Sequence, residues 1–304
     1  MKQYEPISGL RIPCVAMGCM RIAAMEKAAL EKLVMTAVEG GINFFDHADI
    51  YGKGESETRF GEVLSANAAL RNKILIQSKC GIRAGYYDSS YAHIMDSVEA
   101  SLKRLRVECL DVLLIHRPDA LAEPDEIASA FQHLHEAGKV RYFGVSNHNS
   151  MQIKGLQQAL NQPLLFNQLQ MSVMHTGMID QGIHVNTDFA GAVDQDGAVL
   201  EYCKLHKMVV QAWSPLQYGF FEGVFVDNPK FPELNEVLAK MAQKYEISKT
   251  ALAAAWLVRI PAMVQVVTGT TNALRMKEMI KGVNIVLERS DWYEIYRAAG
   301  NQLP

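Results

Sequence analysis

The 304-residue sequence predicts an α/β fold, an eight-stranded parallel (β/α)8 TIM barrel with an extra C-terminal helix, formed by residues 1–304 as a single domain. Short apolar runs alternate with amphipathic helical stretches, which is typical of parallel sheets with helical crossovers. The distances from Asp46 to Lys79, from Lys79 to His116 and from His116 to Ser146 are 33, 37 and 30 residues, close to the ~30 residues of one barrel unit. An open, doubly wound sheet is the alternative, but no G-x-G-x-x-G follows the first strand.

Eight apolar runs have the length and composition of strands that are buried on both faces. They lie at residues 15–17, 42–45, 74–77, 112–115, 141–145, 164–166, 208–212 and 264–267. The first run is the weakest. Residues 1–11 are expected to form a hairpin that closes the N-terminal end of the barrel.

Helices are expected between the strands. Leu30, Leu33, Val34 and Ala37 repeat with the helical period, and Gly40 supplies a stop. Similar stripes occur at 94–105, 127–134 and 234–241, and a last helix near 290–299 is expected outside the barrel. Residues 171–197 and 217–232 form long segments after the sixth and seventh strands. Such loops lie on the active-site face of a barrel, so both are expected to wall a substrate pocket.

Composition narrows the class of function. The net charge is −3, from 30 basic and 33 acidic residues without a long basic run, so neither nucleic acid nor an anionic membrane is an expected partner. The apolar stretch 251–258 is too short to span a bilayer, and the N-terminus has no apolar signal core. The five cysteines form no C-x-x-C pair, as expected of reduced thiols. These features predict a soluble cytoplasmic protein, and a monomer by default.

Polar residues follow the predicted strands at the end where barrel enzymes place their chemistry. Asp46 and Tyr51 follow the second strand, Lys79 ends the third, and His116 ends the fourth. Reduction of a carbonyl by hydride needs a proton for the forming alkoxide. A Lys ammonium beside a Tyr lowers the pKa of the phenol, a carboxylate keeps the ammonium charged, and a His orients the carbonyl oxygen. The four residues are therefore candidate catalytic groups.

The segment from Gly40 to Gly52, GGINFFDHADIYG, and the segment LLIHRPD from Leu113 to Asp119 resemble the corresponding motifs of the aldo-keto reductase family. The resemblance extends from about Ser8 to about Lys281 and is closest to the bacterial YdhF-like oxidoreductases. It implies a (β/α)8 barrel, NADPH (NADP+) as cofactor and a small-molecule aldehyde or ketone as substrate, with Asp46, Tyr51, Lys79 and His116 as the catalytic tetrad.

The resemblance also implies contacts with the cofactor. Ser146, Asn147 and Gln168 fall where the family holds the nicotinamide carboxamide, and Trp213 where an aromatic ring stacks on the nicotinamide. Ser214 and Leu216 open the loop along the pyrophosphate. Gly269, Thr270, Thr271 and Arg275 resemble the loop and helix start that bind the adenosine 2′-phosphate. A helix N-terminus offers amides to an anion, and a guanidinium suits phosphate, which favours NADPH over NADH.

Some positions depart from the family pattern. His47 stands where Thr is more common, Gly269 replaces a basic residue of some members, and residues 171–197 have no counterpart. Two alternatives to the reductase stay open. One is a cofactor-sensing or partner-binding barrel with little turnover, and the other is a metal-dependent hydrolase. His47, Asp49 and His116 match no metal-ligand spacing, and Lys79 would repel a cation, so no metal is expected.

Overall fold

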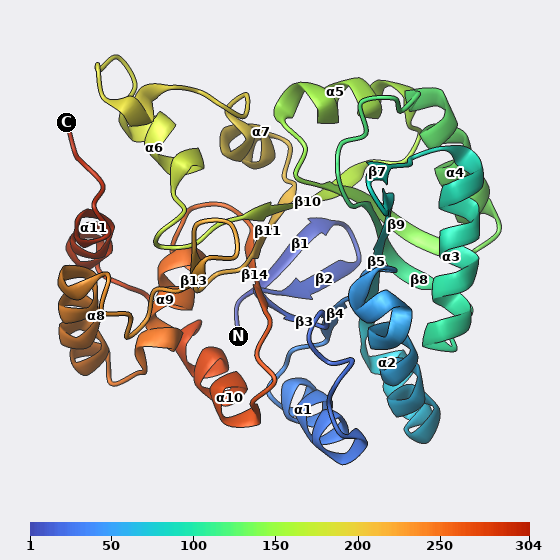
Figure 1. The fold of residues 1–304 in the computed structure, drawn as a ribbon, viewed down its shortest axis with the longest axis horizontal. Helices are drawn as coiled ribbons and strands as arrows, with labels where there is room; N and C mark the ends of the chain where they lie inside the picture. The colour runs from blue at the N-terminus through green and yellow to red at the C-terminus, as the bar shows by residue number, and fades with distance from the viewer.

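The eight apolar runs form the eight strands of a closed parallel barrel in the computed structural model, which describes residues 1–304 (Figure 1). Each strand pairs with the next along the chain, and the last pairs with the first through Val266 and Val15. In barrel order the strands are β3 (Val15–Gly18), β4 (Phe44–Asp46), β5 (Leu75–Cys80), β8 (Leu110–Ile115), β9 (Val140–Ser146), β10 (Leu164–Gln170), β11 (Val209–Trp213) and β14 (Val264–Thr268). The predicted fold is confirmed.

Helices surround the barrel (Figure 1). They are α1 (Lys27–Glu39), α2 (Glu55–Ala66), α3 (Tyr91–Leu105), α4 (Pro124–Glu136), α5 (Ser150–Ala159), α6 (Gly177–Ile183), α7 (Val199–Leu205), α8 (Pro232–Tyr245), α9 (Lys249–Val258), α10 (Ala273–Gly282) and α11 (Arg289–Ala298), with short 3₁₀ turns η1 (Tyr51–Gly54), η2 (Ala68–Lys73) and η3 (Ala190–Ala192). Most of these helices cover the outer face of the strands, whereas α8 and α11 lie outside α9. None of the helices is both long enough and apolar enough to cross a membrane.

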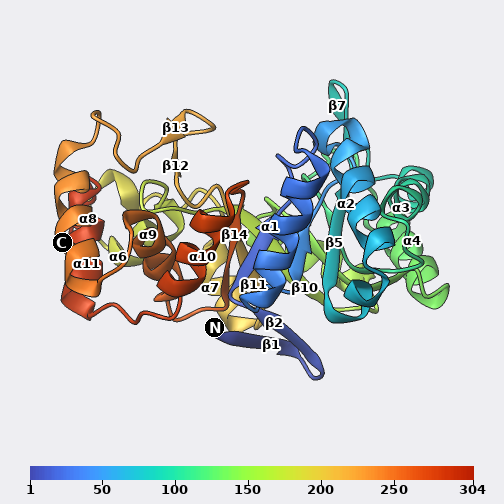
Figure 2. The same ribbon diagram turned by 90° about the horizontal axis from the view of Figure 1, so that it is seen from below.

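An N-terminal hairpin closes one end of the barrel, as the sequence predicts. Its strands, β1 (Gln3–Ile7) and β2 (Leu10–Pro13), pair antiparallel. The hydroxyl of Tyr4 donates a hydrogen bond to the Val264 carbonyl over 3.0 Å, which ties the hairpin to β14. Figure 2 shows the hairpin on one side of the barrel and β7 and β13 on the opposite side.

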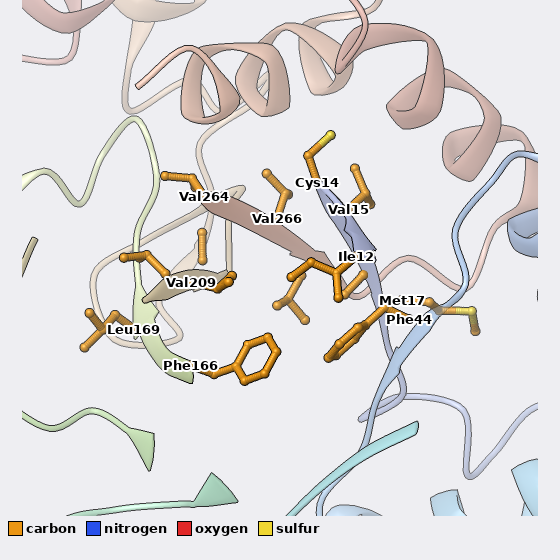
Figure 3. Packing of buried hydrophobic residues seen from close by; sticks show 14 of the residues in the cluster. Ile12, Cys14, Val15, Met17, Phe44, Phe166, Leu169, Val209, Val264 and Val266 are labelled. Carbon is orange, nitrogen blue, oxygen red and sulfur yellow. The ribbon is translucent and has the colours of Figure 1, made fainter. Parts of the chain in front are cut away.

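The barrel interior is filled by side chains. The rings of Phe44 and Phe166, from strands on different sides of the barrel, point toward each other with centroids 5.8 Å apart, and Ile12 of β2 lies beside them (Figure 3). All three side chains are fully buried. Packed side chains at this level leave the opposite end, where the strands have their C-termini, as the place for a site.

Two short hairpins rise at that C-terminal end: β6 (Ile82–Arg83) with β7 (Tyr86–Tyr87), and β12 (Gln217–Tyr218) with β13 (Gly223–Val224). The second hairpin confirms that part of 217–232 walls a cavity at this end of the barrel, since Gln217, Phe221 and Val224 line that cavity.

The expectation that residues 171–197 form another pocket wall is wrong, because none of them lines this cavity. Only its first residues touch the cavity wall, where Ser172 donates to the Gln217 carbonyl over 2.8 Å, and the following residues pack against α11 and the C-terminal tail. Asp180 accepts a hydrogen bond of 2.7 Å from the Tyr296 hydroxyl, and His184 Nε2 lies 2.9 Å from the Gln302 carbonyl. Helix α11 in turn packs against α8 and α9 outside the barrel, as predicted, with the rings of Trp256 and Trp292 stacked at 4.6 Å.

Candidate active site

Three of the four candidate catalytic residues are in direct contact at the C-terminal end of the barrel. Lys79 Nζ lies 2.7 Å from Asp46 Oδ1 and donates to the Tyr51 hydroxyl over 3.1 Å. Its third hydrogen bond, of 2.7 Å, goes to the main-chain carbonyl of His47. The ammonium has therefore used all three of its N–H donors, which fixes its position beneath the tyrosine.

The chain places Tyr51 by continuing β4 into a tight turn. The amides of His47 and Asp49 donate to the carbonyls of Gln77 and Lys79, so the segment still follows β5 after β4 ends. Tyr51 opens η1, and Gly52 follows with φ of 58°. A Cβ atom at Gly52 would lie 2.7 Å from Cβ of Ala23. Glycine is therefore required there by both backbone conformation and space.

The charges in this cluster are set by burial and by one another. Burial lowers the pKa of Lys79, but the Asp46 carboxylate and the Tyr51 hydroxyl outweigh it and raise that pKa above its ordinary value. Burial raises the pKa of Tyr51 by more than the Lys79 ammonium lowers it. The ammonium lowers the pKa of Tyr51, as expected, but burial outweighs it and the net pKa lies above the ordinary value of tyrosine. At neutral pH the pair is a charged Lys79 and a neutral, proton-bearing Tyr51.

His116 lies across the cavity floor from Tyr51, with the two rings edge to face and their centroids 6.0 Å apart. Burial, and then the charges of Lys79 and Arg117, hold the pKa of His116 well below its usual range, so the imidazole is neutral. Its Nδ1 is enclosed without a hydrogen-bond partner, whereas Nε2 is not enclosed. The neutral ring therefore has its accessible nitrogen toward the cavity that it lines.

A layer of buried glutamines supports Asp46 from inside the barrel. Gln77 and Gln168 each donate to Asp46 Oδ1, over 2.5 and 3.0 Å. Gln77 and Gln211 exchange two hydrogen bonds, and Gln211 donates to Gln265 over 2.9 Å. The side chains lie at one level because register pairs Asp46 with Gln77 and Gln168 with Gln211. These amides fix the carboxylate that holds Lys79.

Behind Tyr51, a second polar cluster is enclosed between β5, α2 and α3. Glu57 is fully buried and accepts hydrogen bonds from Ser78 and Arg104. His47 packs edge to face on Phe60 with neither ring nitrogen bonded, and burial lowers its pKa to about 3. Burial and the Glu57 charge raise the pKa of Asp49 to about 6.

The raised pKa of Asp49 predicts a pH-dependent effect on stability. Its folded pKa of about 6 lies above the unfolded value of about 4, so the folded state binds this proton more tightly. The ionised side chain thus costs stability as the pH rises from about 4 to about 6. Asp49→Asn cannot ionise, and we expect it to be more stable than the wild type at pH 7 by about 1–2 kcal/mol and equally stable near pH 4. Urea denaturation at both pH values measures this, with the exposed Asp188→Asn as control. A constant difference at both pH values would contradict it.

One elongated cavity of about 690 Å³ begins at Tyr51 and His116 and extends to α10, a volume in the range of small-molecule sites. Of the fourteen residues that the sequence analysis selects, all except Lys79 line it. Lys79 lies beneath Tyr51 and is 1% exposed. The structure therefore brings the catalytic and cofactor-binding candidates to a single site.

The candidates for nicotinamide binding are already bonded to one another. Asn147 Nδ2 donates to Ser146 Oγ over 2.8 Å, and Asn147 Oδ1 accepts from Trp213 Nε1 over 3.1 Å. Gln168 uses its amide nitrogen on Asp46 and Gln211, while its Oε1 receives no hydrogen bond. Trp213 is stacked on Phe221, with centroids 5.6 Å apart. The free Gln168 Oε1 is the acceptor left for a ligand amide.

At the far end of the cavity, helix α10 begins after Asn272. The Asn272 side chain accepts hydrogen bonds from the amides of Leu274 and Arg275, so these amides are already occupied and the helix offers fewer free donors than expected. The Arg275 side chain is exposed, lines the cavity and has no acidic partner. The guanidinium is thus the main group there for an anion.

Several residues of the site are not among the candidates that the sequence predicts. They are the buried glutamines Gln77, Gln211 and Gln265, and the cavity-lining Arg21, Arg117 and Phe221. The glutamines have a signal, since Gln77 lies two residues before Lys79 and so faces the same side of β5. Arg117 directly follows His116. Arg21 and Phe221 lie on loops without any pattern.

A closed (β/α)8 barrel with Tyr, Lys, Asp and His at the C-terminal ends of its strands, next to a long cavity, defines a barrel oxidoreductase that acts on carbonyl groups. Residues 15–299 match the Aldo/keto reductase family, and the chain belongs to it. It is an NAD(P)H-dependent oxidoreductase.

The relatives agree with this assignment. The chain is 34% identical to the uncharacterized oxidoreductase YcsN of Bacillus subtilis (91% of this chain, 90% of YcsN) and 34% identical to the oxidoreductase YdhF of Escherichia coli (90% and 89%). It is 32% identical to a 6-dehydroglucose reductase of Novosphingobium aromaticivorans (98% and 95%). The fold matches the crystal structure of the thermostable aldo-keto reductase Tm1743 in complex with epalrestat, with a TM-score of 0.80, 22% identity and coverage of 98% and 100%. The predicted relation to the YdhF-like branch is consistent with these matches.

Proposed function

We propose that the protein reduces aldehydes or ketones to alcohols with NADPH, and that Tyr51 donates the proton. The observation that carries the proposal is the contact of Tyr51 with a charged Lys79 that is itself held by Asp46. Tyr51 follows β4 and His116 follows β8, with β5 between these strands, and both residues line the same cavity. A hydroxyl and an imidazole so placed suit a carbonyl oxygen that gains negative charge.

The residues along the cavity suit the binding of NADPH. Gln168 Oε1 is available to a carboxamide N–H group, beside Ser146 and Asn147. Trp213, which is stacked on Phe221, would also stack on the nicotinamide. Ser214 and Leu216 would follow the pyrophosphate, and Gly269, Thr270, Thr271 and Arg275 the 2′-phosphate. When bound, this cofactor supplies the hydride for the carbonyl carbon.

The chain's own groups handle the proton and the developing charge. The pKa of Tyr51 is raised by burial, so its hydroxyl keeps its proton until a carbonyl oxygen becomes basic. As that oxygen takes the proton, the negative charge left on the Tyr51 oxygen lies 3.1 Å from the Lys79 ammonium. Asp46 keeps the ammonium in place. His116, neutral because of burial and nearby cations, hydrogen-bonds the carbonyl oxygen and orients it.

Cofactor binding and turnover test the proposal together. We expect NADPH to quench the fluorescence of Trp213 on titration, and a panel of aldehydes, diketones and quinones to include compounds that oxidise NADPH. Trp213→Phe is the matched control that identifies the responding indole, because Trp256 and Trp292 lie away from the cavity. Tight NADPH binding without oxidation by any compound would favour the cofactor-sensing alternative. If NADPH did not bind, the proposal would be wrong.

Arg275 is expected to decide the choice of cofactor. A guanidinium that binds a phosphate group contributes about 1.5–3 kcal/mol, so Arg275→Met should raise the dissociation constant for NADPH about 10- to 100-fold. NADH lacks the 2′-phosphate, and its affinity should change little. Fluorescence titration with both cofactors measures the effect, and Lys277→Met, an exposed cation on the same helix, is the control. Equal losses of affinity for NADPH and NADH would show that Arg275 does not bind the 2′-phosphate.

Three finer expectations belong to the same proposal. Residues 1–304 act as one barrel domain, since one hydrophobic cluster of 79 buried residues extends from Tyr4 to Tyr296. The protein acts as a monomer in the cytoplasm, where reduced nicotinamide cofactors are available. A single cooperative unfolding transition and the mass in solution from light scattering test the first two of these statements.

A further inference from the structure

Three cations of the active-site cavity have no acidic partner. The cavity is lined by two carboxylates, and both are already paired: Asp46 with Lys79 at 2.7 Å and Asp227 with Lys249 at 2.6 Å. Its three arginines are Arg21, Arg117 and Arg275, and none of their guanidinium groups forms an ion pair or a hydrogen bond within the protein. Arg275 is accounted for by the cofactor proposal above. Arg21 and Arg117 are the two cations of the cavity to which the cofactor proposal assigns no ligand.

Arg117 is placed next to the reacting groups. It directly follows His116, whose ring is edge to face with Tyr51. The loop after Arg117 is fixed, since Asp119 accepts hydrogen bonds of 2.9 Å from the amides of Ser89 and Leu121. The positive charge of Arg117 also acts on His116 and helps to lower the pKa of the imidazole.

The guanidinium of Arg117 is oriented by an aromatic ring and not by an acid. Its Cζ atom lies 6.0 Å from the centre of the Trp213 ring, within the range of a cation–π contact. Trp213 is itself held by its hydrogen bond to Asn147. No acceptor of the protein occupies the N–H donors of Arg117, and the edge of a guanidinium suits the two oxygens of a carboxylate or phosphate.

The rest of the cavity around Tyr51 is mostly apolar. Ile50, Ile82 and Met20 line it, and Phe221 lines it from the β12–β13 hairpin. When a substrate fills the cavity and displaces its water, a charge–charge contact there is screened less than in open solution. An unpaired cation there discriminates strongly between a substrate with an anionic group and a neutral one.

We propose that the preferred substrates are aldehydes or ketones that carry an anionic group, a carboxylate or a phosphate. Arg117 is the specificity-determining residue that binds this group while the carbonyl oxygen lies at Tyr51 and His116. Arg21, on the loop after β3, adds a second positive charge at the cavity. This inference rests on the proposed reductase function, and it adds the chemical class of the substrate.

Matched pairs of substrates test it on the wild-type holoenzyme. One pair is 4-carboxybenzaldehyde and its methyl ester, and the other is glyceraldehyde 3-phosphate and glyceraldehyde. We expect kcat/KM with NADPH to be about 10-fold or more higher for the charged member of at least one pair, as for a charged hydrogen bond. The pair with the larger ratio identifies carboxylate or phosphate as the source. Equal values within each pair would overturn the inference and leave the reductase function standing.

Variants assign the preference to Arg117. Arg117→Met should lower kcat/KM for the charged member about 10- to 100-fold and change the neutral member less than about 3-fold. Arg117→Lys should keep part of the preference, because it keeps the charge without the planar fork. Arg106→Met, an exposed arginine outside this cavity, is the matched control.

Two other outcomes are informative. An unchanged ratio in Arg117→Met, accompanied by a weaker dissociation constant for NADPH, would show that Arg117 binds the cofactor, and it would overturn the inference. Absence of turnover with every member of both pairs, with NADPH bound, would overturn the proposed reductase function as well. Because the neutral members report on the chemistry alone, the two failures are distinguished.

Discussion

Tyr51→Phe is expected to lower turnover by about 10²–10⁴-fold, the usual contribution of a positioned general acid. The change removes one hydroxyl that lies 3.1 Å from Lys79 Nζ and keeps the ring that packs edge to face with His116. The affinity for NADPH should stay within a few-fold of the wild type, since the proposed cofactor contacts lie on β9, β10, β11 and α10. Single-turnover oxidation of bound NADPH by the best aldehyde measures the loss at the chemical step.

The matched control is Tyr91→Phe, which removes a hydroxyl that bonds His133 on the outside of the barrel. It should leave turnover unchanged. A Tyr51→Phe variant that keeps wild-type turnover on the best substrate would exclude Tyr51 as the proton donor. A variant that loses NADPH affinity as strongly as turnover would instead indicate that the hydroxyl acts mainly in binding.

The catalytic candidates are visible in the sequence because each stands at or just after the end of an apolar run. Strand ends are defined by the change from apolar to polar residues, and the barrel brings those ends together without further information. Lys79 and Asp46 could therefore be selected although they are 33 positions apart. What the sequence does not contain is the balance of burial and charge, which raises the pKa of Tyr51 instead of lowering it.

The buried glutamine layer shows a different limit. Three glutamines of this layer lie inside apolar strands and are fully buried: Gln77, Gln211 and Gln265. A prediction based on polar residues at strand ends therefore does not select them. Only the register across strands shows that they meet, and register depends on the whole barrel. A buried amide is stable only where its hydrogen bonds are satisfied, so these positions have to be paired with one another.

Helix α9 and the segment 171–197 mark two further limits. Residues Lys249–Val258 lack a polar stripe because Ala251 through Val258 are all buried, and a helix that is apolar on every side has no helical periodicity to detect. The segment 171–197 is long and polar, features that suit either a pocket wall or a surface excursion. Its docking is decided by contacts with Tyr296, Asn301 and Gln302, more than a hundred positions away.

Lys79→Met is expected to reduce both turnover and stability. Turnover should fall by about 10²–10⁴-fold, because the negative charge that forms on the Tyr51 oxygen then has no cation beside it. The free energy of unfolding should fall by about 3–5 kcal/mol, because Asp46, which is 2% exposed, keeps a buried charge without its partner. Urea denaturation and single-turnover kinetics on the same preparation measure both losses.

The double variant Asp46→Asn with Lys79→Met separates the two effects. With both charges gone, an amide stands at position 46 among the amides of Gln77 and Gln168, and most of the lost stability should return. Turnover should stay as low as in Lys79→Met, because the cation beside Tyr51 is still missing. If the double variant regained turnover, the charge of Lys79 would have no part in the chemistry. If Lys79→Met were as stable as the wild type, the hydrogen bonds from the glutamine layer alone would be enough to stabilise the buried charge of Asp46. The ion pair between Asp46 and Lys79 would then contribute to catalysis and not to the stability of the fold.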